Sequence, residues 1–385
     1  MPGMSIAPNR AAALARLHDF APRMGRAYAA GRNTDPGPGL RRDVSELSPH
    51  IRHRLVTEAE MVGAALAHHT PQAAEKFIQE VFWRSYWKGF LELRPAMWID
   101  YRAQAAMPRA PACEAAMRGE TGIACFDAWA LELRATGYLH NHVRMWFASI
   151  WIFTLRLPWV QGAEFFLEHL LDADAASNTL SWRWVAGIQT PGKHYLARAE
   201  NIARYTEGRF DPRGELDEAA PPLHEPPPPP PGPLPPADSA PARVALLLHG
   251  DDMTFWPAGC EVVAVAGFFA PLARPRAPLA AAFDEAALQD GLAMAEARLG
   301  RPAARLTPQT LAAWAADADA DAVVMPWAPV GWGADALAAT GVPMLGLRRA
   351  WDSACWPLAR KGFFPFRESI PALLRQLTPL AAPAP

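Results

Sequence analysis

The chain has 385 residues, 51% of them hydrophobic, which is enough apolar material for a large buried core and for two or three domains. The 37 basic and 39 acidic residues give a formal net charge of −2, which excludes a uniformly basic nucleic-acid coat protein but allows a local basic groove. Proline, with 40 residues, and tryptophan, with 15, are unusually abundant. We expect one of these excesses to reflect the domain organisation and the other to reflect the function.

The cysteines and the apolar runs exclude several other classes of protein. The four cysteines are widely spaced and form no C-x-x-C pair, so neither a zinc ribbon nor a disulfide-stapled scaffold is indicated. The N-terminus does not resemble a signal peptide, and the richest apolar run, from Trp146 to Trp159, is interrupted by Arg156 and Pro158. We therefore expect a soluble, cytoplasmic protein that binds no metal and no membrane.

Apolar residues recur at helical spacing in the first half of the chain. Examples are Phe77, Val81, Trp87 and Phe90, and this periodicity predicts an all-helical domain from about residue 10 to 215. Residues 216–241 are rich in proline, a composition that cannot pack a core and that favours an extended spacer. We interpret them as a linker between two domains, and a docking site for a proline-binding partner is the alternative.

Short apolar runs follow the linker. They cover 244–248, 261–266, 322–325 and 343–347, with helical stretches at 281–299 and 308–316 between them. This alternation predicts a small α/β domain with a mostly parallel sheet over residues 242–380. The predicted fold class is therefore an all-helical domain followed by a small parallel-sheet α/β domain.

Two segments early in the helical domain combine polar and aromatic side chains. Residues 43–50 form a hydroxyl-rich turn before a helix, which suits either a phosphate cradle or an ordinary N-cap. Farther along the chain, helical spacing places Glu80, Trp83 and Arg84 on one face. That face suits a planar polar ligand, and a packed core with a salt bridge is the competing interpretation.

Two later segments add further polar residues. In residues 136–145, helical spacing places Asn141, Arg144 and Met145 on one face, and the two histidines of this segment diverge too far to predict a metal site. Residues 170–184 hold a cluster for which core packing gives no reason: Asp172, Asp174, Asn178, Trp182 and Trp184. Asp172 could pair with a cation such as Arg144, and Asp174 and Asn178 could hydrogen-bond the heteroatom edge of a planar cofactor.

These four segments, in this order, resemble the photolyase and cryptochrome family of flavoproteins. The segments TGYLHNHVRM and LLDADAASNTLSWRWVAG are similar to the family's T-G-W-M-H-N-R-x-R-M and L-I-D-x-D-x-A-S-N-x-x-W-x-W-x-A. ELSPHI and FIQEVFWRSYW match its phosphate-binding S-x-L-S-P and its E-x-x-W-R helix. The resemblance runs from about Tyr28 to Pro212 and implies a helical domain that holds FAD in a bent form. In the family an α/β domain comes first, so the domain order here is rearranged.

The resemblance implies a role for each matching residue. The FAD phosphates and their surroundings would be held by Tyr28, Ser45, Leu47 and Ser48. The flavin site would be lined by Arg84, Asn141, Arg144, Asp172, Asp174 and Asn178. Within it, Arg144 would pair with Asp172, and Asn178 would face the flavin nitrogen that gains a proton on reduction. A pyrimidine-dimer lesion would contact Arg32, Glu80, Trp83, Asn141, Met145 and Trp184.

The implied activity is that of a DNA photolyase, in which reduced FAD absorbs blue light and splits cyclobutane pyrimidine dimers by electron transfer. Glu80 would stabilise the dimer radical anion, and the partner would be damaged DNA. Trp182 and Trp159 match the inner two members of the family's electron relay; the outer member is missing, and Trp98 or Tyr101 could replace it.

Some features leave alternatives open. His142 stands where the family has Arg, which would weaken a contact with lesion phosphates or make binding depend on pH. One alternative function is a cryptochrome-like photoreceptor without repair activity, and another is a flavin-binding protein that has lost both activities. We expect a monomer, and a protein partner at the proline-rich linker stays an open alternative.

Overall fold

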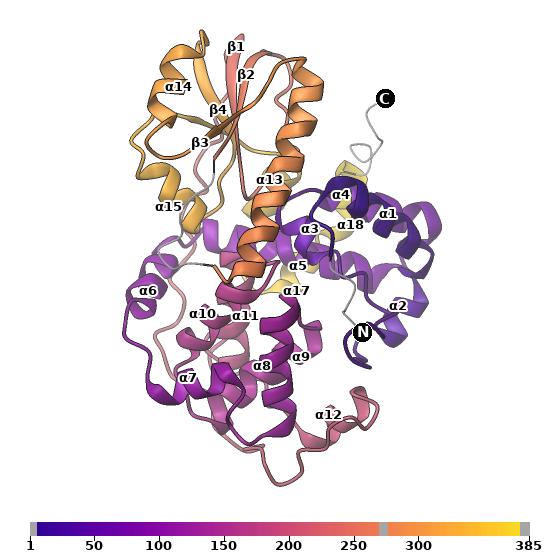
Figure 1. The fold of residues 1–385 in the computed structure, drawn as a ribbon. Helices are drawn as coiled ribbons and strands as arrows, with labels where there is room; N and C mark the ends of the chain where they lie inside the picture. Colours follow the sequence, from indigo (N-terminus) through magenta and orange to yellow (C-terminus); the bar gives the residue numbers. More distant parts are fainter. Residues whose placement is uncertain (1–5, 269–275, 378–385) are drawn as a thin grey trace.

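The computed structural model describes residues 6–268 and 276–377, in which a group of helices precedes a parallel sheet (Figure 1). Of the expected α/β domain, residues 269–275 and 378–380 lie outside the described residues. Among the residues described, no helix has both the length and the apolar composition that a membrane span needs.

The helical part is built around α5. Its helices are α1 (Arg10–Phe20), α2 (Arg26–Gly31), α3 (Ser48–Arg52), α4 (Glu58–His68), α5 (Glu75–Glu92), α6 (Ala96–Ala105), α7 (Pro111–Arg118), α8 (Ala124–Thr136), α9 (Asn141–Ser149), α10 (Trp159–His169), α11 (Ala175–Ala186) and α12 (Ala199–Tyr205). Helix α5 is buried along most of its length and contacts both α4 and α11. A helix surrounded in this way can present polar residues only into an internal cavity or to buried partners.

A five-stranded parallel sheet follows. Its strands β1 (Arg243–His249), β2 (Glu261–Phe268), β3 (Ala304–Leu306), β4 (Ala322–Pro326) and β5 (Leu345–Leu347) lie in the order β3-β2-β1-β4-β5. The helices α13 (Pro278–Leu299), α14 (Leu311–Asp317) and α15 (Trp332–Ala338) connect them. The predicted fold class is confirmed, although β3 went unpredicted because its three residues are too few to show a pattern.

The end of the chain packs against the helical part instead of covering the sheet. Helices α16 (Ala350–Cys355) and α17 (Phe363–Arg367) contact α5, and α18 (Ile370–Leu377) contacts α16 (Figure 1). Trp351 stacks on Phe82 at 4.9 Å between ring centroids, and its indole N–H donates to Ser85 Oγ at 2.8 Å. Gly89 permits the close approach, since a Cβ there would lie 2.7 Å from the Cα of Trp356. Residues that we expected in the α/β domain therefore complete the core around α5.

The proline-rich segment between the sheet and the helices is fastened to the helical part. It contains no helix or strand among its described residues. The backbone N–H of Gly232 donates to Leu93 O at 2.8 Å, and the Arg94 guanidinium donates to Pro229 O at 2.8 Å. Glu225 accepts hydrogen bonds from Trp159 and from Arg183. The segment is extended, as a polyproline sequence favours, and it runs against the body of the protein.

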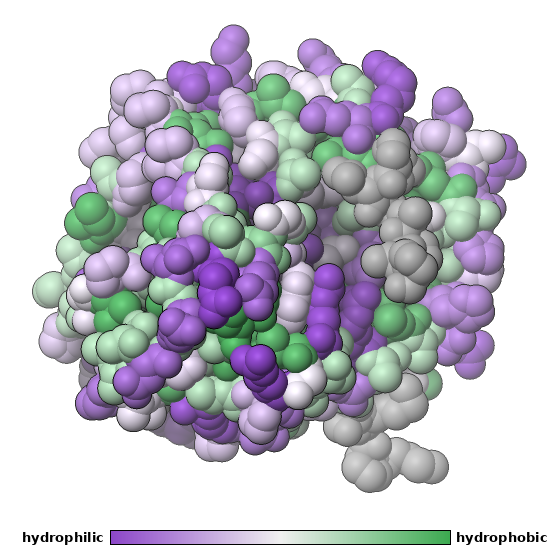
Figure 2. Space-filling view, turned by 90° about the horizontal axis from the view of Figure 1, so that it is seen from above, coloured by the Kyte–Doolittle hydropathy of each residue, from purple (hydrophilic) through white to green (hydrophobic). Residues whose placement is uncertain are grey.

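A buried ion cluster joins the two parts of the chain. Arg54, which follows α3, forms a bidentate pair with Asp352 of α16 at 2.6 and 2.8 Å. The same guanidinium contacts Glu58 of α4 and Asp252, which follows β1. Arg349 donates to both oxygens of Asp252. Outside such clusters, the upper face in Figure 2 shows hydrophobic residues in small groups among hydrophilic ones, as expected for a surface in contact with water.

Candidate functional site

The helical part encloses a cavity of about 570 Å³ between α2, α3, α5, α9 and α11. Most of the site residues predicted from the sequence line it: Tyr28, Arg32, Ser45, Ser48, Glu80, Trp83, Arg84, Asn141, Arg144, Met145, Asp172, Asp174, Asn178, Trp182 and Trp184. Two predicted residues do not line it. The side chain of Leu47 is buried in the hydrophobic core, and Trp159 lies deeper on α10. Residues as far apart in sequence as Tyr28 and Trp184 thus converge on one space.

Asp174 occupies the base of this cavity as the N-cap of α11. Its carboxylate accepts the N–H of Ser177 at 2.8 Å and contacts Lys88 at 3.0 Å and Arg84 at 3.5 Å. Burial alone would raise the pKa of Asp174, but the charges of Lys88, Arg84 and Arg52 outweigh it and hold the pKa well below its usual value. Asp174 is therefore a fixed negative charge that positions two cations from α5.

Arg144 and Asp172 form a bidentate ion pair at the same cavity, with N–O distances of 2.9 and 3.1 Å. Arg144 also donates to Leu139 O at 2.9 Å, which holds its guanidinium plane in place. The side-chain amide nitrogen of Asn178 donates a hydrogen bond to Ala163 O at 3.0 Å, and this bond orients the amide group. Because that bond fixes the rotamer, Asn178 presents a constant polar surface to the cavity.

The side of the cavity near α3 carries hydroxyl groups. Ser45 Oγ accepts the N–H of Leu47 at 3.3 Å, and Glu46 between them has a left-handed φ of 48°, which turns the chain sharply before Ser48 begins α3. Arg16 of α1 donates a hydrogen bond to the carbonyl of Ser45 and forms an ion pair with Glu46, and these two contacts stabilise the turn. Burial raises the pKa of Tyr28, whose ring packs edge to face on Phe77.

Another part of the cavity lining combines one carboxylate with aromatic rings. Glu80 is paired with Arg32, and burial raises the pKa of Glu80 while Arg32 opposes the rise. Trp83 stacks on Phe363 of α17 at 3.6 Å between centroids, and Trp184 stacks on Tyr195 at 5.8 Å. Both tryptophans are half-buried, with one ring face supported by protein. The phenylalanine support comes from the far end of the chain.

His142 occupies the cavity rim without a charge partner among its recorded contacts. Its Nδ1 lies 3.1 Å from Asn33 O, and its ring stacks on Trp146 at 4.4 Å. Burial lowers the pKa of His142, and the hydrogen bond with Asn33 only partly opposes this shift. The side chain is therefore neutral at pH 7 and supplies no fixed positive charge where the family has Arg.

Two buried polar groups at the cavity lack hydrogen-bond partners in the described part of the chain, and they therefore indicate whether a polar ligand fits there. Among the described residues, the hydroxyl of Ser177 and the indole N–H of Trp182 have no hydrogen-bond partner, although both residues line the cavity. Buried polar groups are almost always hydrogen-bonded in native proteins, so such orphans point to a missing partner. Together with hydroxyls at one end, a bidentate ion pair and aromatic surfaces, they fit a ligand that has phosphates and a planar ring system, as FAD has.

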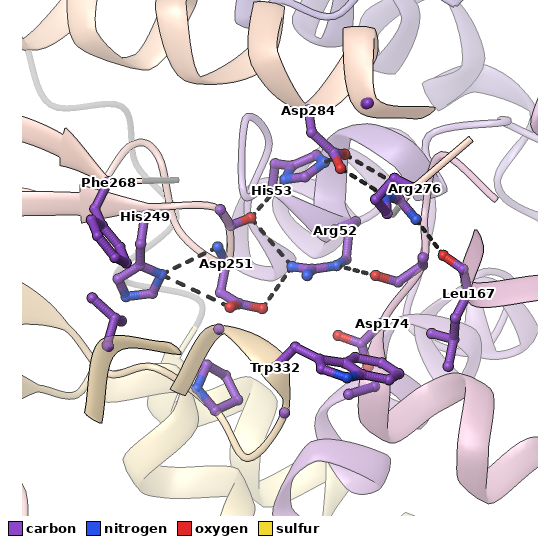
Figure 3. Close-up of a pocket in the computed structure, with 18 of the residues that line it drawn as sticks. Arg52, His53, Leu167, Asp174, His249, Asp251, Phe268, Arg276, Asp284 and Trp332 are labelled. Carbon is purple, nitrogen blue, oxygen red and sulfur yellow. Dashed lines mark hydrogen bonds and ion pairs between the residues drawn. The ribbon is translucent and has the colours of Figure 1, made fainter. Parts of the chain in front are cut away.

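A second cavity of about 670 Å³ lies between the helical part and the carboxyl ends of β1 and β2 (Figure 3). Arg52 donates to Asp251 at 2.6 Å across it, and Asp284 of α13 contacts His53 at 3.1 Å and Arg276 at 2.8 Å. Asp174 lines this cavity as well as the first one. The sequence reasoning did not identify this space, because its lining comes from loops that only the packing of the two parts brings together.

Asp284 should make stability depend on pH. Burial would raise its pKa, but Arg276 and His53 lower it to about 2, so its stabilising effect is complete above the unfolded value near 4 and is lost as pH falls. Asp284→Asn should cost about 2 kcal/mol of unfolding free energy at pH 6 and about half of that at pH 3. Urea denaturation at both pH values measures this. Asp319→Asn is the control, because the side chain of Asp319 is 97% exposed. An equal loss of stability at both pH values in Asp284→Asn would contradict the lowered pKa of Asp284.

Sequence reasoning also missed Lys88, although a signal for it existed. It lies four residues after Arg84 and eight after Glu80, so helical spacing places it on the same face of α5. Glu225 had no such signal, because a single acid in a proline tract does not indicate which residue it will meet.

Comparison with known proteins also points to FAD binding by the helical part. Residues 77–218 match a family described as the FAD binding domain of DNA photolyase. The deoxyribodipyrimidine photo-lyase of Streptomyces griseus is 35% identical over 197 residues, which are 47% of this chain and 42% of that protein. Cryptochrome-1 of Arabidopsis thaliana is 38% identical over 98 residues, 26% of this chain and 14% of that protein.

Among solved structures, a bacterial class III photolyase from Agrobacterium tumefaciens is 27% identical with a TM-score of 0.43, covering 52% of this chain and 43% of that one. The chain thus spans less than half the length of the curated photolyases that it matches. The family match covers α5 to α12 and contains the Arg144–Asp172 pair and most of the aromatic residues of the cavity. The helical segment 77–218 therefore belongs to the FAD-binding domains of the photolyase and cryptochrome family.

Proposed function

We propose that this protein binds FAD in the cavity of its helical part and splits cyclobutane pyrimidine dimers in DNA under blue light. The observation that carries this proposal is one cavity whose lining combines hydroxyl groups, an ion pair between Arg144 and Asp172, the carboxylate of Glu80 and aromatic rings. Reduced FAD, when bound, would supply the electron that opens the dimer.

The chain's own residues would bind and orient the two ligands. Ser45 and Ser48 would contact the phosphates, while Arg84, Asn141, the Arg144–Asp172 pair and Asp174 would hold the flavin portion. Asn178 would present its fixed amide to the flavin ring. Leu47 would act only through its backbone and its packing, because its side chain is in the core.

A dimer flipped out of the duplex would enter beside Glu80. Trp83 and Trp184 offer aromatic surfaces for its two rings, Met145 a soft side chain to fill the gap between them, and Asn141 and Arg32 further polar contacts. The raised pKa of Glu80 favours a carboxyl group that can share a proton with a base edge, and its pairing with Arg32 keeps it in position. Flipping costs less at an already distorted lesion, which favours damaged over intact DNA.

Trp83→Ala tests the lesion side of the cavity. Losing one stacking surface should weaken binding of a dimer-containing oligonucleotide by about 5- to 150-fold, since stacking on an aromatic side chain contributes about 1–3 kcal/mol per base. The matched control is Trp256→Ala, another half-buried tryptophan, which packs under Arg298 away from both cavities. An unchanged dissociation constant for Trp83→Ala together with normal FAD content would contradict the assigned surface.

The activity itself is tested by illuminating the reduced protein with dimer-containing DNA and following the return of thymine absorbance. Light-dependent recovery supports repair. Absence of recovery at saturating reduced flavin overturns it. FAD photochemistry without any lesion affinity would instead assign the protein to the photoreceptors.

A further inference from the structure

Helix α17 covers one face of a tryptophan at the first cavity. The Trp83 ring of α5 lines that cavity, and the Phe363 ring of α17 stacks on it at 3.6 Å between centroids and 11° between ring planes. The two helices are in contact, although the whole sheet lies between them in sequence (Figure 1). A ring that is stacked so closely on one side has only its other face left for a ligand.

Other aromatic contacts hold the Trp83 ring as well. Tyr86 meets it edge to face at 5.6 Å, and Trp87 lies against it at 5.2 Å. The Tyr86 hydroxyl donates to Lys361 O at 2.9 Å, and the Tyr86 ring packs on Phe363 at 5.5 Å, so the start of α17 is bound to α5. Together these contacts oppose rotation of the Trp83 ring out of its position.

Glu80 makes the position of this ring matter for recognition. It lies one helical turn before Trp83 on α5, lines the same cavity and is paired with Arg32. A flipped dimer that hydrogen-bonds Glu80 can stack on Trp83 only where the indole has the right distance and angle from that carboxylate. Because a half-buried indole can adopt several rotamers, contacts that select one of them contribute to ligand affinity.

Building on the proposed function, we propose that Phe363 is a positioning residue of the lesion site, which fixes Trp83 in the orientation that a flipped pyrimidine dimer needs. Phe363 is not among the residues that line the cavity, so it acts through Trp83. It also lies outside residues 77–218, which match the family. The segment that follows the sheet thereby takes part in recognising the lesion.

Phe366 shows what a purely packing role in the same helix looks like. It is 2% exposed, compared with 5% for Phe363, and it packs on Tyr86 at 5.5 Å and on Phe82 at 6.3 Å. Within the described part of the chain, the ring contacts of Trp83 include Phe363 but not Phe366. The two phenylalanines therefore separate support of Trp83 from support of the core.

Binding of a dimer-containing oligonucleotide to the FAD-loaded protein tests the proposal. Phe363→Leu removes the stacked ring but stays apolar, and it should weaken this binding by about 2- to 12-fold, the factor that corresponds to the stacking energy of one aromatic pair. Affinity for the undamaged oligonucleotide and FAD content should not change, because neither depends on a base stacked on Trp83. Phe363→Met, which fills the space with a flexible chain, should have the same effect. Phe366→Leu is the matched control and should leave the affinity for the lesion unchanged.

A double-mutant cycle with Trp83→Ala measures whether Phe363 acts through the indole. In that background Phe363→Leu should have no further effect on the affinity for the lesion, because no ring remains to be positioned. The same loss in both backgrounds would overturn the proposal. Equal losses in Phe363→Leu and Phe366→Leu would also overturn it, since they would reduce Phe363 to a core residue.

Fluorine NMR of protein labelled with fluorotryptophan reports on Trp83 without any DNA. The Trp83 signal, assigned by its loss in Trp83→Phe, should shift or broaden in Phe363→Leu and stay in place in Phe366→Leu. An unchanged signal in Phe363→Leu would refute the positioning role. Wild-type protein that binds dimer-containing and undamaged DNA equally would instead sink the proposed function, and the Trp83 signal would still decide whether Phe363 fixes the indole.

Discussion

Arg54→Met should lower the free energy of unfolding by about 3–5 kcal/mol, the cost of removing one partner from a buried ion cluster. Arg54 is the cation that Glu58, Asp252 and Asp352 share, and its side chain is 5% exposed. Without it, Asp352 loses its bidentate partner and the three carboxylates repel one another inside the protein. Arg54 has a positive φ of 51°, but methionine bears the same backbone strain as arginine, so that strain cancels in the comparison.

The prediction is measured by urea denaturation with circular dichroism. Arg102→Met is the control, because Arg102 pairs with Asp335 at the surface, with side chains 49% and 37% exposed, and should cost no more than about 1 kcal/mol. An Arg54 effect as small as that of the control would show that the cluster does not hold the two parts together. Because the cluster joins α4, the β1 loop and α16, we also expect limited proteolysis to separate the two parts faster in the variant.

Asp174→Asn should weaken FAD binding at least about tenfold and destabilise the fold by about 3–5 kcal/mol. Asparagine keeps the N-cap of α11 but removes the negative charge that holds Lys88 and Arg84, and Lys88 is then left buried at 3% exposure. Arg84 lines the FAD cavity, so its displacement acts directly on the ligand. Asp174→Ala removes the cap as well and should cost about 1 kcal/mol more.

Flavin fluorescence titration and urea denaturation measure the two effects on the same samples. Asp127→Asn serves as the control, since Asp127 accepts N–H bonds from Thr121 and Gly122 at the start of α8 but lines neither cavity. Its effect on FAD affinity should be negligible. Normal FAD affinity in Asp174→Asn would mean that the charge at the base of the cavity does not position the cofactor.

Much of the candidate site follows from local sequence. Glu80, Trp83 and Arg84 share a face of α5 because a helix repeats every 3.6 residues, and Asp174 caps α11 because an acid before a helix accepts its free N–H groups. The resemblance to photolyases then linked segments that periodicity alone leaves separate. The parallel sheet was also predictable, since alternating apolar runs and helices have few other arrangements.

The tertiary structure decided which distant residues meet. Sequence alone determined a helical domain, an α/β domain and a set of polar and aromatic residues matching a flavin site, because those depend on local spacing and on motifs. Phe363 behind Trp83, Asp352 on Arg54, Glu225 on Trp159 and Glu164 on Tyr101 all join segments that carry no local sign of one another. Such contacts depend on how whole elements pack, and the packing of α16 and α17 against α5 brought the end of the chain to the helical part.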